Sequence, residues 1–229
     1  MSLREYTRAN DFDRIVGRLQ TSNVIKLGVG NSILDIGCGI GEYTQAFTDR
    51  FGTVVGLDPD HNCLEEAINT TEGVKYIQGF GETFKLKEKF DTISLNNILE
   101  HVDDPIKLLQ NCKKHLKHGG KIIVQVPNAG SPARKLGVKM GIIPSLNHIS
   151  PKERDFYGHQ RVYYLSSLIG DCQEAGLSVV QTGGILYKPL PNGDLWNLYQ
   201  EKGMEFVNAL LDFGESRPQD CACIFAVCQ

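Results

Sequence analysis

Short apolar runs alternate with amphipathic segments over the first half of the chain. Runs typical of buried strands lie at residues 32–37, 53–58, 74–79, 90–95 and 121–126. Between most of them, apolar residues recur every three or four positions, which predicts helices. Buried strands that alternate with helices form right-handed βαβ units. The pattern therefore predicts a parallel sheet covered by helices on both faces.

The predicted helices are defined by the residues of their apolar faces. The first has Phe12, Ile15, Val16 and Leu19, the second Tyr43, Phe47 and Phe51, the third Leu64, Ala67 and Ile68, and the fourth Ile106, Leu109, Cys112 and Leu116, before a stop at Gly119 and Gly120. The spacing in each set is that of one helix face, so we expect these residues to pack against the sheet.

The regular alternation ends after Pro127. Residues 129–162 are rich in Gly, Pro, Ser and His with little periodicity, which predicts an insertion folded over the edge of the sheet. Connections of this length are usually lids or binding loops. A helix near 166–175, a strand near 177–187, a helix near 194–212 and a final strand complete the prediction. The helix near 194–212 has Leu195, Leu198, Phe206 and Leu210 on one side, to cover the sheet or a partner.

Composition narrows the class of protein. The 229 residues are 41% hydrophobic and 22% charged, with a formal charge of −3 and scattered basic residues, so no nucleic-acid surface is expected. No apolar run reaches the length of a membrane span and the first residues do not form a signal peptide, so we expect a soluble cytoplasmic protein, a monomer or homodimer. The seven cysteines are scattered, and the pair Cys221 and Cys223 lacks the spacing of zinc ligands. Free buried thiols and no metal are expected.

The first strand runs into a glycine-rich turn with the sequence ILDIGCGIG. Its glycines are Gly37, Gly39 and Gly41, which lets the backbone turn sharply and approach a ligand. The dinucleotide fingerprint GxGxxG has its third glycine one residue later. Asp35 also precedes the turn, where a carboxylate would repel a pyrophosphate but suit a ligand that carries an ammonium and a sulfonium. The pattern favours S-adenosylmethionine.

Asp58 ends the second strand, 17 residues after Gly41. An acidic side chain at this place can accept hydrogen bonds from both hydroxyls of a ribose. The alternative is that Asp58 caps a helix that begins at Pro59. After Asp35 and the glycines, the ribose role is the better interpretation.

These residues resemble the motifs of class I S-adenosylmethionine-dependent methyltransferases. The resemblance lies in ILDIGCGIGEYT, VVGLDPD, FDTISLNNILEHVDDP and LKHGGKIIVQVPN, in order over residues 30–128. It implies a doubly wound α/β fold whose seven-stranded sheet ends in an antiparallel strand, here residues 221–228. GHQRVYYLSSL and GGILYKPL are similar to a looser subgroup that modifies sugars, surface-glycan precursors or antibiotic intermediates.

The resemblance divides a single methyltransferase domain, residues 1–229, into four parts. They are an N-terminal helical cap (1–29), a cofactor-binding half (30–128), a substrate lid (129–162) and the C-terminal half of the sheet (163–229). In the cap, Tyr6 and Arg8 are expected to face the cofactor.

One position departs from the family. In QGFGETF the family usually has an acid that contacts the adenine amino group, where this chain has Phe80. Phe80 either walls the adenine ring, with the Gly81 amide still donating, or belongs to the core. We expect the cofactor S-adenosylmethionine to contact Asp35, Gly37, Gly39, Gly41, Tyr43, Asp58, Pro59, Phe80, Gly81, Glu82, Asn96, Asn97 and His101.

The candidate substrate residues lie mostly in and just after the insertion. His159, Arg161 and Lys188 would form a cationic pocket for a carboxylate or phosphate, with Tyr164 beside them; the alternative is that Arg161 and Lys188 pair with acids on a solvated face. A hydroxyl or ammonium nucleophile needs a general base, whereas a carboxylate or phosphate needs none. The candidate bases are His159, His101 and His148, and His101 could instead stabilise its own turn.

Three functions fit these residues. The first is O-methylation of a small anionic metabolite, such as a phosphorylated or nucleotide-linked sugar, a phosphate ester or a carboxylic acid. The second is N-methylation of an amino sugar or another small amine, which calls for acids or aromatics around the nitrogen. The third is a non-catalytic cofactor-binding protein, against which the retained Asp35 and Asp58 argue.

Overall fold

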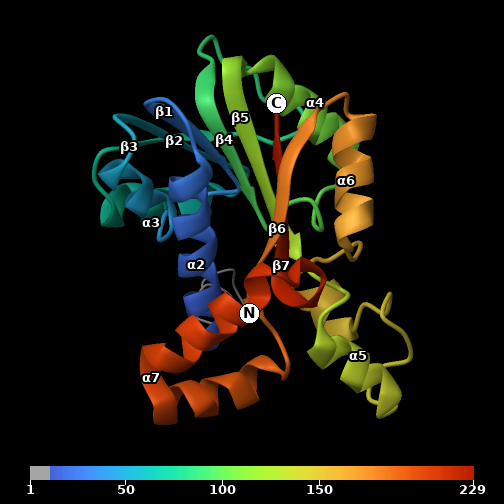
Figure 1. Ribbon diagram of the computed structural model, residues 1–229. Coiled ribbons are helices and arrows are strands. Elements are labelled where there is room, and N and C mark those ends of the chain that lie inside the picture. Colours follow the sequence, from blue (N-terminus) through green and yellow to red (C-terminus); the bar gives the residue numbers. More distant parts are fainter. Residues whose placement is uncertain (1–10) are drawn as a thin grey trace.

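Seven strands form one sheet in the computed structural model, which describes residues 11–229 (Figure 1). Their order is β3-β2-β1-β4-β5-β7-β6. The strands are β1 (Ser32–Ile36), β2 (Thr53–Asp58), β3 (Val74–Gln78), β4 (Phe90–Asn96), β5 (Leu116–Pro127), β6 (Val179–Tyr187) and β7 (Cys221–Cys228). Neighbouring strands from β3 to β5 are parallel, and β7 is antiparallel to both β5 and β6. The predicted sheet, with its antiparallel last strand, is confirmed. Tyr6 and Arg8 lie outside the described residues.

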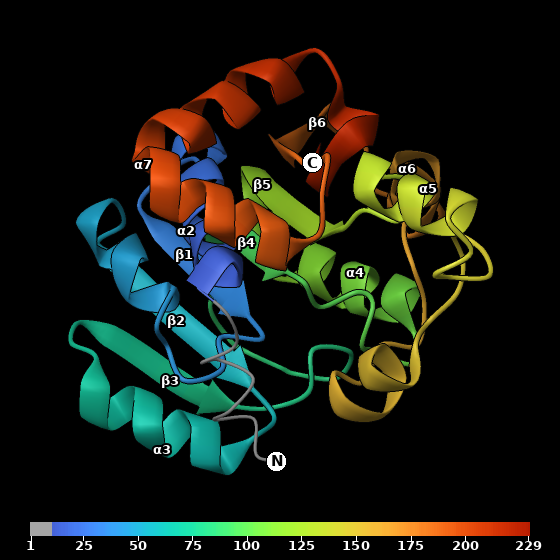
Figure 2. The ribbon, with the colours of Figure 1, turned by 90° about the horizontal axis from the view of Figure 1, so that it is seen from below.

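Helices cover both faces of the sheet (Figures 1 and 2). The helices α2 (Asp11–Leu27) and α7 (Asn192–Glu215) and the short 3₁₀ helix η1 (Thr44–Asp49) pack on one face, and α4 (Pro105–Lys114) and α6 (Leu165–Glu174) pack on the other. Adjacent residues of β1 belong to different hydrophobic clusters. Ile33 packs with residues of α2 and α7 on one face, and Leu34 packs with residues of α4 and α6 on the other. Successive strand side chains point to opposite faces, so a sheet buried on both faces needs unbroken apolar runs.

The strand order places a crevice at one end of the sheet. β1 lies between β2 and β4, so the chain leaves β1 towards one edge and later returns to its other side at β4. In an open α/β sheet, ligands bind outside the carboxyl ends of the strands at such a switch point. The helix α3 (His61–Thr70) follows β2 from this end.

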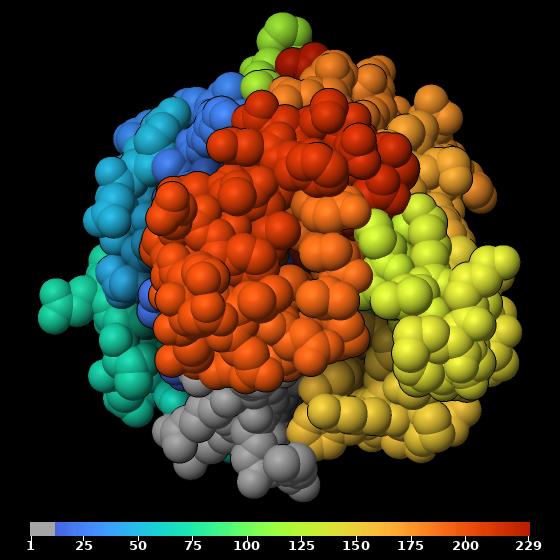
Figure 3. Space-filling view, turned by 60° about the horizontal axis from the view of Figure 1, so that its bottom comes forward, coloured from blue at the N-terminus to red at the C-terminus, as the bar shows by residue number. Residues whose placement is uncertain are grey.

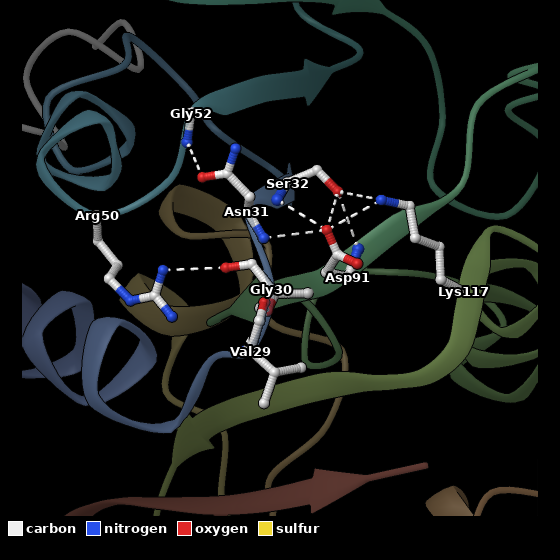
Figure 4. A network of polar contacts seen from close by, with 9 residues as sticks. Val29, Gly30, Asn31, Ser32, Arg50, Gly52, Asp91 and Lys117 are labelled. Carbon is white, nitrogen blue, oxygen red and sulfur yellow. Dashed lines mark hydrogen bonds and ion pairs between the residues drawn. The ribbon is translucent and has the colours of Figure 1, made fainter.

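The opposite end of the sheet is held by Asp91, at the start of β4 (Figure 4). Its Oδ2 accepts hydrogen bonds from the Asn31 amide at 3.1 Å, from the Ser32 amide at 3.0 Å and hydroxyl at 2.6 Å, and from Lys117 Nζ at 3.0 Å. Burial alone would raise the pKa of Asp91, but these hydrogen bonds lower it to about 2. The carboxylate thus joins the start of β1 to β4 and β5.

Several local predictions were wrong. The segment with Phe47 is a single 3₁₀ helix. Leu116 begins β5, because α4 ends at Lys114. Ile68 is 63% exposed although Leu64 and Ala67 beside it are buried. The insertion contains the short helix α5 (Pro132–Lys139), which has no buried residue, and a π-helical turn η2 (Lys152–Phe156).

The predicted helix near 194–212 extends as α7 over Asn192–Glu215, with a kink at Gly203. Leu195 and Leu210 are buried and Phe206 packs beside them, so this helix covers the sheet within the chain. All seven cysteines are buried and free, as predicted. Among residues 11–229, no helix combines the length and apolar character needed to cross a membrane.

Candidate functional site

A cavity of about 1110 Å³ lies at the carboxyl ends of β1, β2 and β4. Its walls come from α2, the glycine turn, the segment after β4, the insertion and the end of β6. Figure 3 shows this end of the molecule, with the surfaces of α7 and α5 over it. The crevice expected from the strand order is therefore present, and the insertion contributes residues to its wall.

The glycine turn forms one wall of the cavity. A side chain at Gly39 would meet no atom within 4 Å, so the backbone here faces open space that a ligand can fill. Gly41 has a different role, because a Cβ there would lie 2.2 Å from the Tyr76 hydroxyl, and it does not line the cavity. Both residues have positive φ angles, which favour glycine.

Two carboxylates stand at the ends of the first two strands. Asp35 is buried, and its Oδ2 accepts a hydrogen bond from the Thr44 hydroxyl at 2.6 Å; burial raises its pKa to about 6. Asp58 accepts hydrogen bonds from the amides of Gly39 and Asp60, each at 2.9 Å. Asp60, not Asp58, caps α3, so the capping alternative for Asp58 is wrong. Both carboxylates line the cavity.

The remaining predicted cofactor residues surround the same space. Phe80 is 65% exposed and lines the cavity, so it does not belong to the core. Asn97 exchanges two hydrogen bonds with Gln20 of α2, at 2.9 and 3.1 Å, while the Asn96 carboxamide accepts one from Gln125. The predicted residues on the cavity wall are Asp35, Gly37, Gly39, Tyr43, Asp58, Pro59, Phe80, Gly81, Glu82, Asn96, Asn97 and His101.

Glu100, His101 and His159 meet at another part of the cavity wall. The rings of the two histidines are 4.8 Å apart, edge to face, and His101 Nε2 lies 3.8 Å from Glu100 Oε1. Burial, with the neighbouring imidazole of His159, lowers the pKa of His101 to about 4, and burial lowers that of His159 as well. Both rings are therefore neutral near pH 7 and able to accept a proton.

Only part of the predicted cationic pocket reaches the cavity. Lys188 lines it, together with the acids Asp13 and Glu153. Arg161 does not, because its guanidinium donates hydrogen bonds to the carbonyls of Leu99, Val102 and Asp103. This side chain holds the loop after β4, so we no longer place it in the pocket.

Two further predicted residues also lie outside the cavity wall. The Tyr164 hydroxyl donates to Asn147 Oδ1 at 2.7 Å, within the insertion. The backbone carbonyl of His148 accepts a hydrogen bond from Arg134. Neither residue lines the cavity, and His148 therefore has no geometric support as a base.

Comparison with known proteins gives the family. Residues 6–182 match the family model described as a methyltransferase domain. Ubiquinone biosynthesis O-methyltransferase from Pseudomonas syringae pv. tomato is 30% identical over 167 residues, which are 70% of each chain. The enzyme of the same name from Idiomarina loihiensis is 28% identical over 70% of this chain and 67% of its own. This chain is an S-adenosylmethionine-dependent methyltransferase.

Solved structures of methyltransferases share the fold. A structure from Thermotoga maritima, described as a possible histamine N-methyltransferase, covers 99% of this chain and 95% of its own, with a TM-score of 0.69 and 20% identity. The N-methyltransferase NodS from Bradyrhizobium japonicum, solved with S-adenosylhomocysteine, covers 96% and 88%, with a TM-score of 0.60 and 15% identity. At these identities the likeness concerns the fold.

The cavity of the methyltransferase fits its cofactor. The open space at Gly39 admits a ligand against the backbone, and the carboxylates of Asp35 and Asp58 suit a group with an ammonium and two ribose hydroxyls. Phe80 offers an exposed ring near Gly81 for the adenine. We propose these four residues as the cofactor contacts.

Sequence reasoning gave no role to Glu100. It precedes His101 directly, but a sequence does not show that its carboxylate is buried. Gln20 was also missed, since its partner Asn97 is 77 residues away. Both residues line the cavity.

Proposed function

We propose that this methyltransferase transfers a methyl group to a hydroxyl oxygen of a small molecule that also carries a carboxylate or phosphate. Bound S-adenosylmethionine supplies the methyl group as part of a sulfonium. The chain's own residues have to hold the hydroxyl in line with that group, exclude water and accept the hydroxyl proton.

The pair of neutral imidazoles carries this proposal. His101 and His159 line the cavity with rings 4.8 Å apart, and their lowered pKa values keep them free to accept a proton. An alcohol needs such a base, whereas a carboxylate or phosphate nucleophile does not. The curated relatives with 30% and 28% identity are named O-methyltransferases, which supports oxygen as the acceptor atom.

Lys188 supports a negative group on the acceptor. Lys188 is the one lysine among the described residues that line the cavity. Burial lowers its pKa, and an anion bound beside it would favour the protonated form again. Arg14 also lines the cavity, but its guanidinium lies 3.9 Å from the carboxylate of Glu42, so we assign the anion to Lys188, which offers a point charge. We therefore expect one anionic group on the acceptor, of either carboxylate or phosphate type.

The acids around Lys188 favour a second candidate, N-methylation of a small amine. Asp13 and Glu153 line the same part of the cavity and would attract an ammonium. The similar folds from Thermotoga maritima and Bradyrhizobium japonicum are also described as N-methyltransferases, the first as a possible one. The acceptor atom is thus the first thing to measure.

The test is methyl transfer from labelled S-adenosylmethionine to paired acceptors. Each pair contains a hydroxyl compound with a carboxylate or phosphate and the amine that replaces its hydroxyl. We expect label in the O-methyl product. Lys188→Ala should raise KM for the anionic acceptor about tenfold or more and leave the affinity for S-adenosylhomocysteine within about twofold. Lys139→Ala, an exposed lysine outside the cavity, is the matched control.

Histidine variants test the proton acceptor. His159→Ala should lower kcat by about 100-fold or more, which is the usual contribution of a positioned base. His148→Ala removes the same side chain outside the cavity and should change kcat less than twofold. Preferential methylation of the amines, or equal activity of the two variants, would refute the proposed function.

A further inference from the structure

Glu100 is a buried carboxyl group that no other residue of the described part of the chain hydrogen-bonds. The residue is 2% exposed, and among residues 11–229 its carboxylate oxygens find no partner within hydrogen-bond geometry, apart from a weaker interaction with the residue's own backbone amide. A buried ionised carboxylate without partners is strongly unfavourable, so in native proteins such a group is usually paired or protonated. Its position four residues after β4, on the wall of the cavity, places this exception in the functional site.

The groups around Glu100 do not supply the missing hydrogen bond. Arg161 has a favourable charge, but its guanidinium is engaged by backbone carbonyls. The Tyr163 hydroxyl, which also interacts electrostatically with Glu100, donates to Asp171 at 2.8 Å. Within the described part of the chain, the thiol of Cys223 also interacts electrostatically with Glu100.

Two imidazoles share this site with the carboxylate. The ring of His101 interacts with the backbone of Tyr157 and Gly158, and its Nε2 lies 3.8 Å from Glu100 Oε1. One nitrogen or oxygen atom from each of Glu100, His101 and His159 lies within 4.8 Å of the others. Three groups that can each hold a proton thus converge, and each neutral imidazole can donate from one ring nitrogen while the other accepts.

The cluster reverses the usual order of basicity. Burial raises the pKa of Glu100 to about 8, whereas burial and the neighbouring imidazole lower that of His101 to about 4. The cause is the same for both, because burial favours the neutral form of each group. A proton that enters the cluster is therefore held best by the carboxylate.

We propose that Glu100 is the final proton acceptor of the methyl transfer, which receives through His101 and His159 the proton that leaves the acceptor hydroxyl. This inference rests on the proposed function. The acceptor oxygen loses its proton to the cluster and forms a bond to the methyl carbon, while the electron pair of the broken carbon–sulfur bond stays on sulfur. The protonated Glu100 then returns its proton to solvent through the same imidazoles. Glu100 does not touch the acceptor. It acts through the histidines by holding the proton that they pass on, and is in this sense a positioning residue.

The pH dependence of kcat/KM tests this role. The acceptor is an alcohol whose own hydroxyl does not titrate between pH 6 and 10. We expect the wild type to gain about tenfold per pH unit up to about pH 8 and then to level off, since only ionised Glu100 can take the proton. In Glu100→Gln this limb should disappear, with less than threefold change between pH 6 and 9 and at least a 100-fold lower plateau.

Two controls separate this role from a structural one. Glu88→Gln removes the same charge from an exposed site outside the cavity and should keep the wild-type profile. If Glu100→Gln is less active at every pH but keeps the limb near pH 8, the proposal is overturned. Loss of wild-type activity with a chelator, and recovery with Mg²⁺ or Mn²⁺, would overturn it too, because the cluster would then hold a metal ion instead of a proton.

A readout without substrate distinguishes this inference from the proposed function. Infrared difference spectra of the protein with S-adenosylhomocysteine should show a protonated carboxyl band that is lost near pH 8 in the wild type and is missing in Glu100→Gln. If no hydroxyl compound accepts a methyl group, the proposed function fails while this titration is still measurable. If Glu100 is already ionised at pH 6, the inference fails whichever acceptor is methylated.

Discussion

Asp91, at the start of β4, and Glu100, four residues after its end, show how differently the two ends of the sheet treat a carboxylate. Asp91, at the start of the strand, accepts hydrogen bonds from Asn31, Ser32 and Lys117, and its pKa falls to about 2 (Figure 4). Glu100, beyond the end of the strand, receives no hydrogen bond from any other residue of 11–229 on its carboxylate, and burial raises its pKa to about 8. Glu100 lies only nine positions after Asp91 in the sequence, yet Asp91 stabilises the fold in its ionised form whereas ionised Glu100 destabilises it.

The difference follows from what each end of the sheet has to do. At the amino ends, the chain can surround a carboxylate with amides and a lysine, and the resulting bonds stabilise the fold. At the carboxyl ends, the cavity must stay open for the cofactor and acceptor, so polar groups there keep unused hydrogen-bonding capacity. Perturbed pKa values gather at functional sites for this reason.

The largest expected effect concerns the stability of Glu100→Gln at high pH. Below its ordinary pKa of 4.5, Glu100 is protonated in the folded and the unfolded chain. As the pH rises towards 8, only the unfolded chain releases the proton, so the wild type loses stability across this window. At about 1.4 kcal/mol per pKa unit, the loss is on the order of 5 kcal/mol. Gln cannot ionise, so urea unfolding at pH 9 should find the variant more stable relative to the wild type than at pH 4.5.

The same series measured on Glu88→Gln is the control, since that variant removes a carboxylate from an exposed position. A difference between wild type and Glu100→Gln that stays constant from pH 4.5 to 9 would show that Glu100 is ionised in the folded protein. The contrast with Asp91 would then be lost.

A smaller effect of opposite sign is expected for Asp91. The stabilisation from Asp91 is full above its ordinary pKa of 3.8 and is lost as the pH falls through about 2. Asp91→Asn should cost about 2 kcal/mol at pH 7, because hydrogen bonds to a charged group are stronger than neutral ones. Urea unfolding measures this cost, which should shrink below pH 4, while the folded variant binds S-adenosylhomocysteine normally. Asp212→Asn, an exposed change on α7, should cost less than about 0.5 kcal/mol.

The cofactor end of the cavity, around Asp35 and Asp58, and its acceptor end, around His101 and His159, also differ in how far the sequence predicts them. Asp35 and Asp58 lie at the carboxyl ends of predicted strands and Gly39 in the turn after the first, and parallel strands bring their carboxyl ends together. Their position on the cavity wall could therefore be predicted from spacing and resemblance. Buried strands were predicted for a similar reason, because a sheet covered on both faces requires unbroken apolar runs.

The acceptor end depends on contacts between distant parts of the chain. His101 and His159 meet only because the insertion folds back on the loop after β4, and Gln160 fixes this contact with hydrogen bonds to Glu100 and His101 backbone carbonyls. The same contact removes Arg161 from the predicted pocket. The charge of an arginine can be read from a sequence, whereas the carbonyls that engage it cannot.

The smallest expected effect concerns polar groups at the cavity that are fully paired, unlike Glu100. Gln20 of α2 and Asn97 after β4 exchange two hydrogen bonds, and Gln20 is 2% exposed. If pairing rather than location decides stability, this pair should behave like Asp91 and contribute about 1 kcal/mol. A double-mutant cycle with Gln20→Ala and Asn97→Ala should give a coupling energy of that size in urea unfolding.

A control cycle combines Gln20→Ala with Asn111→Ala. The carboxamide of Asn111 donates to the carbonyls of Gly81 and Phe84 and not to Gln20, so the two changes in unfolding free energy should be additive. Equal coupling in both cycles would mean that the end of the sheet, and not the pairing of each group, sets the energies.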